Sequence, residues 1–363
     1  MRSKFLLAIV FVFSICFPLL SYHSYQQGQT GVELDDFQAL SKNDWNTIEN
    51  FSQGIVTCAK RIEFPGFPRA FNPSFIKVDQ GFLFIFRTMP DDWQHWVSHI
   101  GVVLLDEEFK PLHAPKILDT RCGHQVTPSQ SEDARLFSFQ GKIYLIYNDN
   151  REITCPSLYY DRRDMYLAEL MISGHTYTLG NPLKLIHEKK YDSQRVQKNW
   201  IPFEWQGKLL LAYTMNPHEI LVPDLNTGIC KPLYESHATL QWGLGTPRGS
   251  SIPVMMDGEY FAIFHSGVHT NSPASGWARW HYFMGAYAFS PHPPFELTKM
   301  TPLAITAPGF YVDSGCEKRV IFPGGAIVLG DKILVAYGRD DCEMWIATLN
   351  KDKLKKAMWP IAK

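Results

Sequence analysis

Hydrophobic and polar residues alternate along most of the chain in short runs separated by turn residues, a pattern typical of β-hairpins. The clearest example covers residues 131–149, in which two apolar runs flank a Gln140-Gly141 turn. Four more turn residues occupy the same register as Gly141, and they are Gln80, Gly207, Gly258 and Asp331. Six positions after each turn stands an aromatic residue, namely Phe86, Tyr147, Tyr213, Phe264 and Tyr337. The pattern indicates five copies of one hairpin module.

A single hairpin cannot bury both of its faces, so five copies must pack against one another. We therefore predict an all-β fold, a five-bladed β-propeller covering residues 56–363. The alternative is an ordinary β-sandwich in which the hairpins are unrelated. The apolar stretch from Met344 to Leu349 is expected to close the ring, and Lys351 to Ala357 is expected to form a basic helical tail.

The N-terminal residues 1–22 resemble a targeting segment. Arg2 and Lys4 precede an apolar run from Phe5 to Leu20, which is short for a membrane span of about 20 residues. No obvious small-x-small cleavage site follows, so a cleaved signal peptide and an uncleaved signal anchor both stay open. We expect export to a secreted, periplasmic or lumenal location, with membrane contact only through this segment. Residues 23–55 are expected to form a linker and a short helix.

Net charge and cysteine content bear on which partners and metal sites this protein could have. The 363 residues carry a formal net charge of −1, which gives no support to a nucleic-acid partner. Of seven cysteines, Cys16 lies in the targeting segment, and the other six allow up to three disulfides in an oxidising compartment. The absence of a CxxC motif and of Cys/His ligand spacing predicts no metal site, and no organic cofactor is expected.

In a propeller the innermost strands begin together at one end of the central channel. The residues eight positions before each turn should therefore share one cavity, and they are Asn72, Asp133, Asn199, Ser250 and Pro323. Cations lie close to them in the sequence: Arg69, Arg135, Lys198, Arg248 and Arg319. Cations around one carboxylate favour an anionic or polyhydroxylated ligand. The alternative is a set of structural ion pairs at a solvated mouth.

Six short blocks carry a resemblance to a known family. They are Phe71-Asn72-Pro73, Glu132-Asp133-x-Arg135, Lys198-Asn199-Trp200, Gly245-Thr246-Pro247, Phe264-His265 and Val320-x-Phe322-Pro323-x-Gly325. In this order the blocks resemble family 130 of the glycoside hydrolases, which contains β-mannoside phosphorylases and hydrolases, and its mannosyltransferase relatives. The resemblance implies a five-bladed propeller, an oligosaccharide or glycoconjugate substrate, and an inverting reaction with Asp133 as proton donor.

The resemblance also implies how the attacking group is supplied. Either inorganic phosphate, as a co-substrate, is held by cations, or water is activated by a second carboxylate, for which the candidates are Glu132, Asp313 and Glu317. The expected substrate contacts are Asn72, Arg87, Arg135, Lys198, Asn199, Arg248, His265, Asp313 and Arg319.

Two departures from the family pattern bear on the reaction. Ala134 stands where the family usually has proline, and the block from Gly245 to Ser251 is not the commonest phosphorylase form. Together with export, the second departure favours hydrolysis or mannosyl transfer over phosphorolysis. A catalytically inactive glycan-binding propeller and a membrane-anchored glycosyltransferase of glycan assembly are the alternatives. Trp200 is expected in the core rather than at the sugar, and His218 and His265 are expected to be structural rather than catalytic.

Overall fold

The computed structural model describes residues 53–89, 97–120, 130–150, 163–191, 196–271, 278–311 and 318–362. The chain divides into two compact units, Met1–Thr47 and Ile48–Lys363, and every described residue belongs to the second. The targeting segment and the expected short helix lie outside the described residues, so both stay predictions. Among the described residues no helix has the length and apolar character needed to cross a bilayer.

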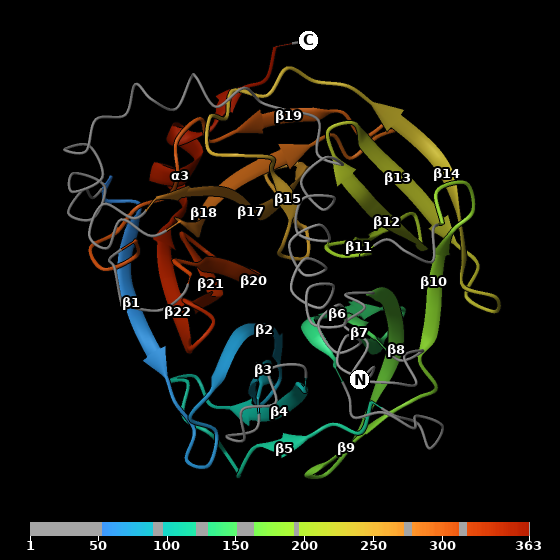
Figure 1. Ribbon diagram of the computed structural model, residues 1–363, viewed down its shortest axis with the longest axis vertical. Helices are drawn as coiled ribbons and strands as arrows, with labels where there is room; N and C mark the ends of the chain where they lie inside the picture. The colour runs from blue at the N-terminus through green and yellow to red at the C-terminus, as the bar shows by residue number, and fades with distance from the viewer. Residues whose placement is uncertain are drawn as a thin grey trace, which may run out of the picture. The chain divides into compact units, whose positions relative to one another are not determined.

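The second unit is a five-bladed β-propeller, as predicted (Figure 1). The strands of each blade run antiparallel and are given from the centre outwards. Blade 1 contains β2 (Ala70–Val78), β3 (Gly81–Thr88), β4 (His99–Leu105) and β5 (Lys116–Ile117). Blade 2 contains β6 (Glu132–Phe139), β7 (Lys142–Asp149), β8 (Asp164–Ser173) and β10 (Leu183–His187), and β9 (Thr176–Leu179) also pairs with β8. Blade 3 contains β11 (Ile201–Trp205), β12 (Lys208–Met215), β13 (His218–Pro223) and β14 (Ile229–Ser236).

The last two blades use strands from distant parts of the chain. In blade 4, β15 (Arg248–Gly249) and β16 (Val254–Met256) both pair with β17 (Glu259–Asn271), and β18 (Ala278–Phe289), β19 (Leu297–Met300) and β23 (Trp359–Pro360) follow. Blade 5 contains β20 (Ile321–Leu329), β21 (Lys332–Arg339), β22 (Glu343–Asn350) and β1 (Val56–Ile62). The predicted helical tail is α3 (Lys351–Ala357).

Ring closure differs from the sequence-based expectation. The stretch from Met344 to Leu349 is the third strand of blade 5, and β1, from the start of the second unit, adds the outermost strand by pairing with β22. The pattern of β1 concealed it, because five of its seven residues are exposed and no apolar alternation marks them as a strand. The two ends of the unit are thus joined within one sheet.

The repeat register is confirmed at the turns and at the aromatic positions. In all five inner hairpins the predicted turn residue is the second of a two-residue turn. In four blades the aromatic six positions later faces its cross-strand partner in the third strand, whereas Tyr213 of blade 3 lies at a register shift and packs on Trp200 and His187 instead. Phe86 covers Gly101, where a Cβ would come within 2.3 Å of the ring, and Tyr147 stacks on Tyr166 at 5.8 Å between ring centroids.

The core lies between neighbouring blades. Leu83 and Ile85 of blade 1 pack with Leu136 and Leu145 of blade 2, and equivalent clusters join blades 2 and 3, 3 and 4, and 5 and 1. Trp200 is 1% exposed and belongs to the cluster between blades 2 and 3, which confirms its assignment to the core.

Fewer disulfides are available than the sequence allowed. Cys58 on β1 is an exposed free thiol and Cys230 in β14 is a buried one. The predicted maximum of three bridges is therefore not reached. Cys122, Cys155 and Cys316 lie outside the described residues.

Candidate active site

A repeated backbone irregularity shapes the candidate site. Asn72, Asp133 and Asn199 have φ values of 48°, 51° and 64°, in the left-handed region that asparagine and aspartate tolerate better than most residues. The β2–β3 and β6–β7 ladders shift register at the first two of these positions. Such a bulge re-aims the side chain of the extra residue. The Asn72 amide Nδ2 donates a hydrogen bond to Asp133 Oδ1 at 2.9 Å, so positions from two blades meet as predicted.

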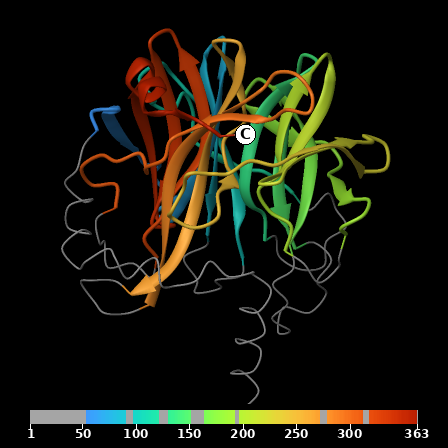
Figure 2. The same ribbon diagram turned by 90° about the horizontal axis from the view of Figure 1, so that it is seen from above.

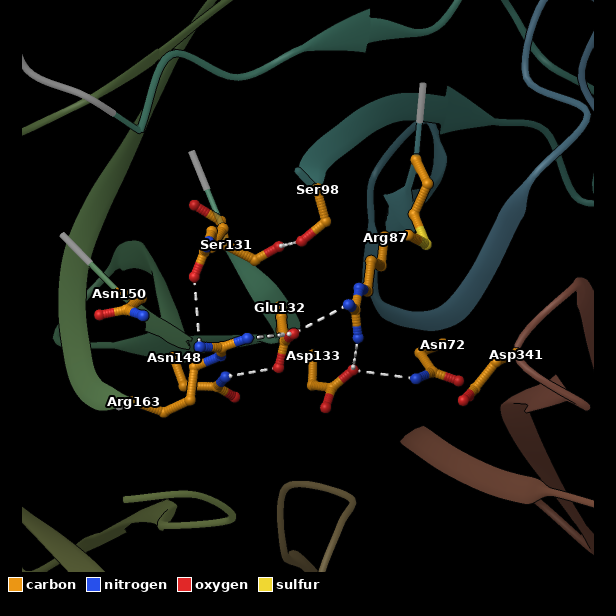
Figure 3. A network of polar contacts seen from close by, with 12 residues as sticks. Asn72, Arg87, Ser98, Ser131, Glu132, Asp133, Asn148, Asn150, Arg163 and Asp341 are labelled. Carbon is orange, nitrogen blue, oxygen red and sulfur yellow. Dashed lines mark hydrogen bonds and ion pairs between the residues drawn. The ribbon is translucent and has the colours of Figure 1, made fainter. Parts of the chain in front are cut away.

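Figure 3 shows the Asp133 carboxylate in contact with Asn72 and Arg87. Asp133 is 9% exposed, and its nearest cationic atom is Arg87 Nη1, 3.8 Å from Oδ1. Within the described part of the chain, Oδ2 accepts no hydrogen bond. This oxygen is therefore available to accept a hydrogen bond from a ligand.

Glu132, next to Asp133, lies in a very different environment. Arg87 donates to Oε1 at 2.8 Å and Arg163 to the same oxygen at 3.1 Å. Oε2 accepts hydrogen bonds from Lys198 at 2.9 Å and from Asn148 at 3.1 Å. Burial alone would raise the pKa of Glu132, but the positive charges of Arg87, Lys198 and Arg163 outweigh it and hold that pKa well below its usual value. Glu132 is a fixed anion with both oxygens occupied, which argues against a role as general base.

Arg135 and Asn199 form the other side of the candidate site. The Arg135 side chain donates to Asn199 Oδ1 at 3.1 Å, and its guanidinium lies over the Phe322 ring at 5.7 Å. Arg135 is fully buried, and burial lowers its pKa to about 10, although the nearby Asp133 carboxylate favours the charged form. Its Nε and Nη1 have no hydrogen-bond partner in the described part of the structure. The buried Arg135 cation contributes positive charge that favours an anionic ligand nearby.

His265 joins the cationic side of the site. It is buried, its Nδ1 lies within hydrogen-bond distance of Ser250 Oγ, and its ring contacts Phe322 at 4.8 Å between centroids. Burial lowers the pKa of His265 well below its usual value, and the positive charges of Arg248, Arg135 and Lys198 lower it further. The imidazole is therefore neutral near pH 7 and serves as a hydrogen-bonding group beside three cations.

Two more of the predicted substrate contacts, Arg248 and Arg319, lie at blades 4 and 5. Arg248 begins β15, whose backbone pairs with His265. Arg319 is buried where blade 5 meets blade 4, because its main chain exchanges hydrogen bonds with Trp280 and Tyr282 of β18. Asp313 lies outside the described residues. His218 is a core residue, as expected, with its ring 5.0 Å from that of Phe289.

Sequence reasoning missed two residues of the cluster. Asn148 occupies the position seven after the turn, in the same register as Arg87 and His265, so a signal for it existed. Arg163 precedes β8 and has no counterpart in the repeat, so only the three-dimensional structure reveals its contact with Glu132. Among the described ranges, no group of three or more His, Cys, Asp or Glu side chains is placed to hold a metal ion.

The chain is similar to several solved structures, although its sequence matches no protein-family model and no curated protein significantly. Among solved structures, one described as a putative glycoside hydrolase of Parabacteroides distasonis superposes with a TM-score of 0.58 at 14% identity, covering 84% of this chain and 98% of that chain. The β-1,2-mannobiose phosphorylase of Listeria innocua gives a TM-score of 0.53 at 14% identity, with coverages of 84% and 94%.

A third structure is a mannose phosphorylase of Leishmania mexicana in complex with phosphate ion, with a TM-score of 0.55 at 12% identity and coverages of 95% and 98%. This chain has the fold of these enzymes. The resemblance inferred from the six sequence blocks is thus confirmed at the level of fold.

Proposed function

We propose that this protein is a carbohydrate-active enzyme that cleaves β-mannosides or related glycans with inversion, with Asp133 as the proton donor. One observation carries the proposal. Asp133 lies where bulges from neighbouring blades converge, bonded to the neutral Asn72 amide, while the adjacent Glu132 takes the direct contacts with the cations. Two neighbouring carboxylates in contrasting environments are the arrangement by which enzymes assign different roles to them.

The proposed step uses Asp133 to donate its proton to the oxygen of the leaving sugar, directly or through a sugar hydroxyl. As the bond between the anomeric carbon and that oxygen breaks, a nucleophile forms a new bond on the opposite face. The attack inverts the anomeric configuration, and the proton leaves with the departing sugar.

The surrounding charges bear on the identity of the nucleophile. Of the three carboxylates considered as a base for water, Glu132 is saturated with donors, and Asp313 and Glu317 lie outside the described residues. By contrast, Arg135, Lys198 and Arg248 bring positive charge to one place. These contacts favour inorganic phosphate as the attacking co-substrate, so we propose phosphorolysis in place of the hydrolysis or mannosyl transfer that the sequence blocks favoured.

The test is turnover by the full chain and by Asp133→Asn. The substrates are β-1,2- and β-1,4-linked mannosides, each with and without phosphate and with and without GDP-mannose. We expect phosphate-dependent turnover by the wild type and a loss of at least about a thousandfold in Asp133→Asn, because the proton donor is removed. Sugar affinity should persist, since asparagine keeps the shape. Asp257→Asn is the matched control, because within the described part of the chain Asp257 pairs with Lys351 and Lys355 at the surface.

The other outcomes discriminate between the alternatives. Turnover in Asp133→Asn equal to wild type would refute the role of Asp133. Sugar binding without turnover in either form would favour a glycan-binding propeller, and turnover only with GDP-mannose would favour a glycosyltransferase. Export directed by residues 1–22 is part of the proposal, and N-terminal sequencing of the mature protein distinguishes a cleaved signal from an anchor.

A further inference from the structure

Among the described residues, β17 and β18 are longer than the second and third strands of the other blades. They comprise 13 and 12 residues, whereas the corresponding strands of blade 1, β3 and β4, comprise 8 and 7. The two strands pair continuously from Tyr260–Phe289 to Asn271–Ala278. Figure 2 shows this hairpin continuing below the other strands of the view. The extension begins near His265 and leads away from the candidate active site.

One face of the extension carries a row of rings. Residues two apart in a strand share a face, so His265, Gly267 and His269 lie on the same face as their cross-strand neighbours Tyr282 and Trp280. The ring centroids of His265 and Tyr282 are 5.8 Å apart, those of Tyr282 and Trp280 are 5.9 Å apart, and those of Trp280 and His269 are 5.3 Å apart. We call Tyr282, Trp280 and His269 the aromatic row.

The aromatic row becomes more exposed with distance from the site. His265 is buried, Tyr282 and Trp280 are half-buried, and His269 is exposed. Tyr282, the inner end of the row, lies close enough to the candidate site that the positive charges of Lys318, Arg248 and Lys198 interact electrostatically with its hydroxyl. The row therefore runs from the cationic side of the candidate site towards increasingly exposed positions.

The row is held in place by its surroundings. Gly267 lets the Tyr282 ring lie directly over the neighbouring strand, because a Cβ there would come within 2.6 Å of the ring. The main chain of Arg319 donates to Trp280 O at 3.0 Å and accepts from Tyr282 N at 2.8 Å. Trp242 Nε1 donates to Ser266 Oγ at 2.9 Å. A surface ordered before binding loses little conformational entropy when a ligand arrives.

We propose that Tyr282, Trp280 and His269 form an extended stacking surface for sugar rings outside the catalytic pocket. Half-exposed aromatic rings match the apolar C–H faces of pyranose rings, and a row of them suits a chain of such rings. This inference rests on the proposed function and deepens it. The substrate is then an oligosaccharide or glycoconjugate that continues beyond the cleaved linkage, rather than a free disaccharide.

The test is the dependence of affinity on chain length. Mannooligosaccharides of two to five units, β-1,2- and β-1,4-linked, are titrated by calorimetry into the full chain with Asp133→Asn, which prevents their consumption. We expect affinity to rise with length, and Trp280→Ala to reduce that gain by about tenfold. Trp280→Phe, which keeps a ring, should retain most of the gain. Trp359→Ala is the control, since Trp359 is 56% exposed on β23 at the outer edge of the same blade.

The outcomes separate this inference from the proposed function. Equal length dependence in Trp280→Ala and the Asp133→Asn parent would overturn the stacking surface, as would affinity that does not rise with length or no binding of any saccharide. Turnover by the wild type, measured in parallel, tests the enzyme itself. Length-dependent binding that requires a ring at position 280, without turnover, would support the surface and reject the enzymatic proposal.

Discussion

The cluster around Glu132 allows a quantitative prediction, because its three ion pairs determine how much stability is lost when the charge of Glu132 is removed. The Glu132 side chain is 6% exposed and pairs with Arg87 at 2.8 Å, Lys198 at 2.9 Å and Arg163 at 3.1 Å. Glu132→Gln keeps the size of the side chain but removes its charge, which leaves three cations without their shared counterion. Removing one partner of a buried ion pair lowers the free energy of unfolding by about 3–5 kcal/mol. We expect the free energy of unfolding at pH 7 to fall by about that amount.

The same substitution has a defined pH dependence. The pKa of Glu132 in the folded protein lies well below its ordinary value of 4.5, so the ionised carboxylate contributes its full stability above about pH 4.5. That contribution is lost as the pH falls through the folded-state pKa, because the wild-type carboxylate then takes up a proton. Glutamine does not titrate, so the difference between wild type and variant should be greatest above pH 4.5 and narrow below it.

Urea unfolding at pH 7, 5 and 3.5 measures both effects. Glu169→Gln is the matched control, because the Lys142–Glu169 pair has a similar distance of 2.8 Å but side chains that are 56% and 33% exposed. It should cost only about 0–1 kcal/mol. The reasoning is refuted if Glu132→Gln costs no more than this control at pH 7, or if the difference from wild type stays constant down to pH 3.5.

Two further substitutions test the packing and charge of the site. Gly338→Ala would place a Cβ 2.1 Å from Asn72 Oδ1, so we expect the free energy of unfolding to fall by about 1–3 kcal/mol and turnover to be reduced. The control Gly243→Ala, whose Cβ meets nothing within 4 Å, should be neutral. Unchanged turnover in Gly338→Ala would contradict the role of Asn72. Arg135→Met removes a buried positive charge beside the candidate site, so the KM for phosphate should rise at least about tenfold. An unchanged KM would remove Arg135 from the phosphate site.

The sequence was sufficient for those features that repeat. Turn residues such as Gly141 and aromatics such as Phe86 recur in register, and each copy meets the same packing requirement, so the blades could be predicted. The features that do not repeat could not be predicted from the sequence. Strand β1 reads as a polar stretch because it lies at the exposed outer edge of blade 5. Arg163 reaches Glu132 from just before the third strand of blade 2, and no spacing in the sequence encodes that contact.

The asymmetry of the site arises from small departures within the repeat. Seven positions after the turn, blade 1 has Arg87 and blade 5 has Gly338. Arg87 extends to Glu132, whereas Gly338 leaves the space in which the Asn72 amide lies against the backbone of blade 5. Asn72 can then direct its Nδ2 at Asp133. Five identical copies would have given every carboxylate the same neighbours. Because one copy supplies a cation and another supplies only space, two adjacent carboxylates acquire different partners, and a division of catalytic roles between them becomes chemically feasible.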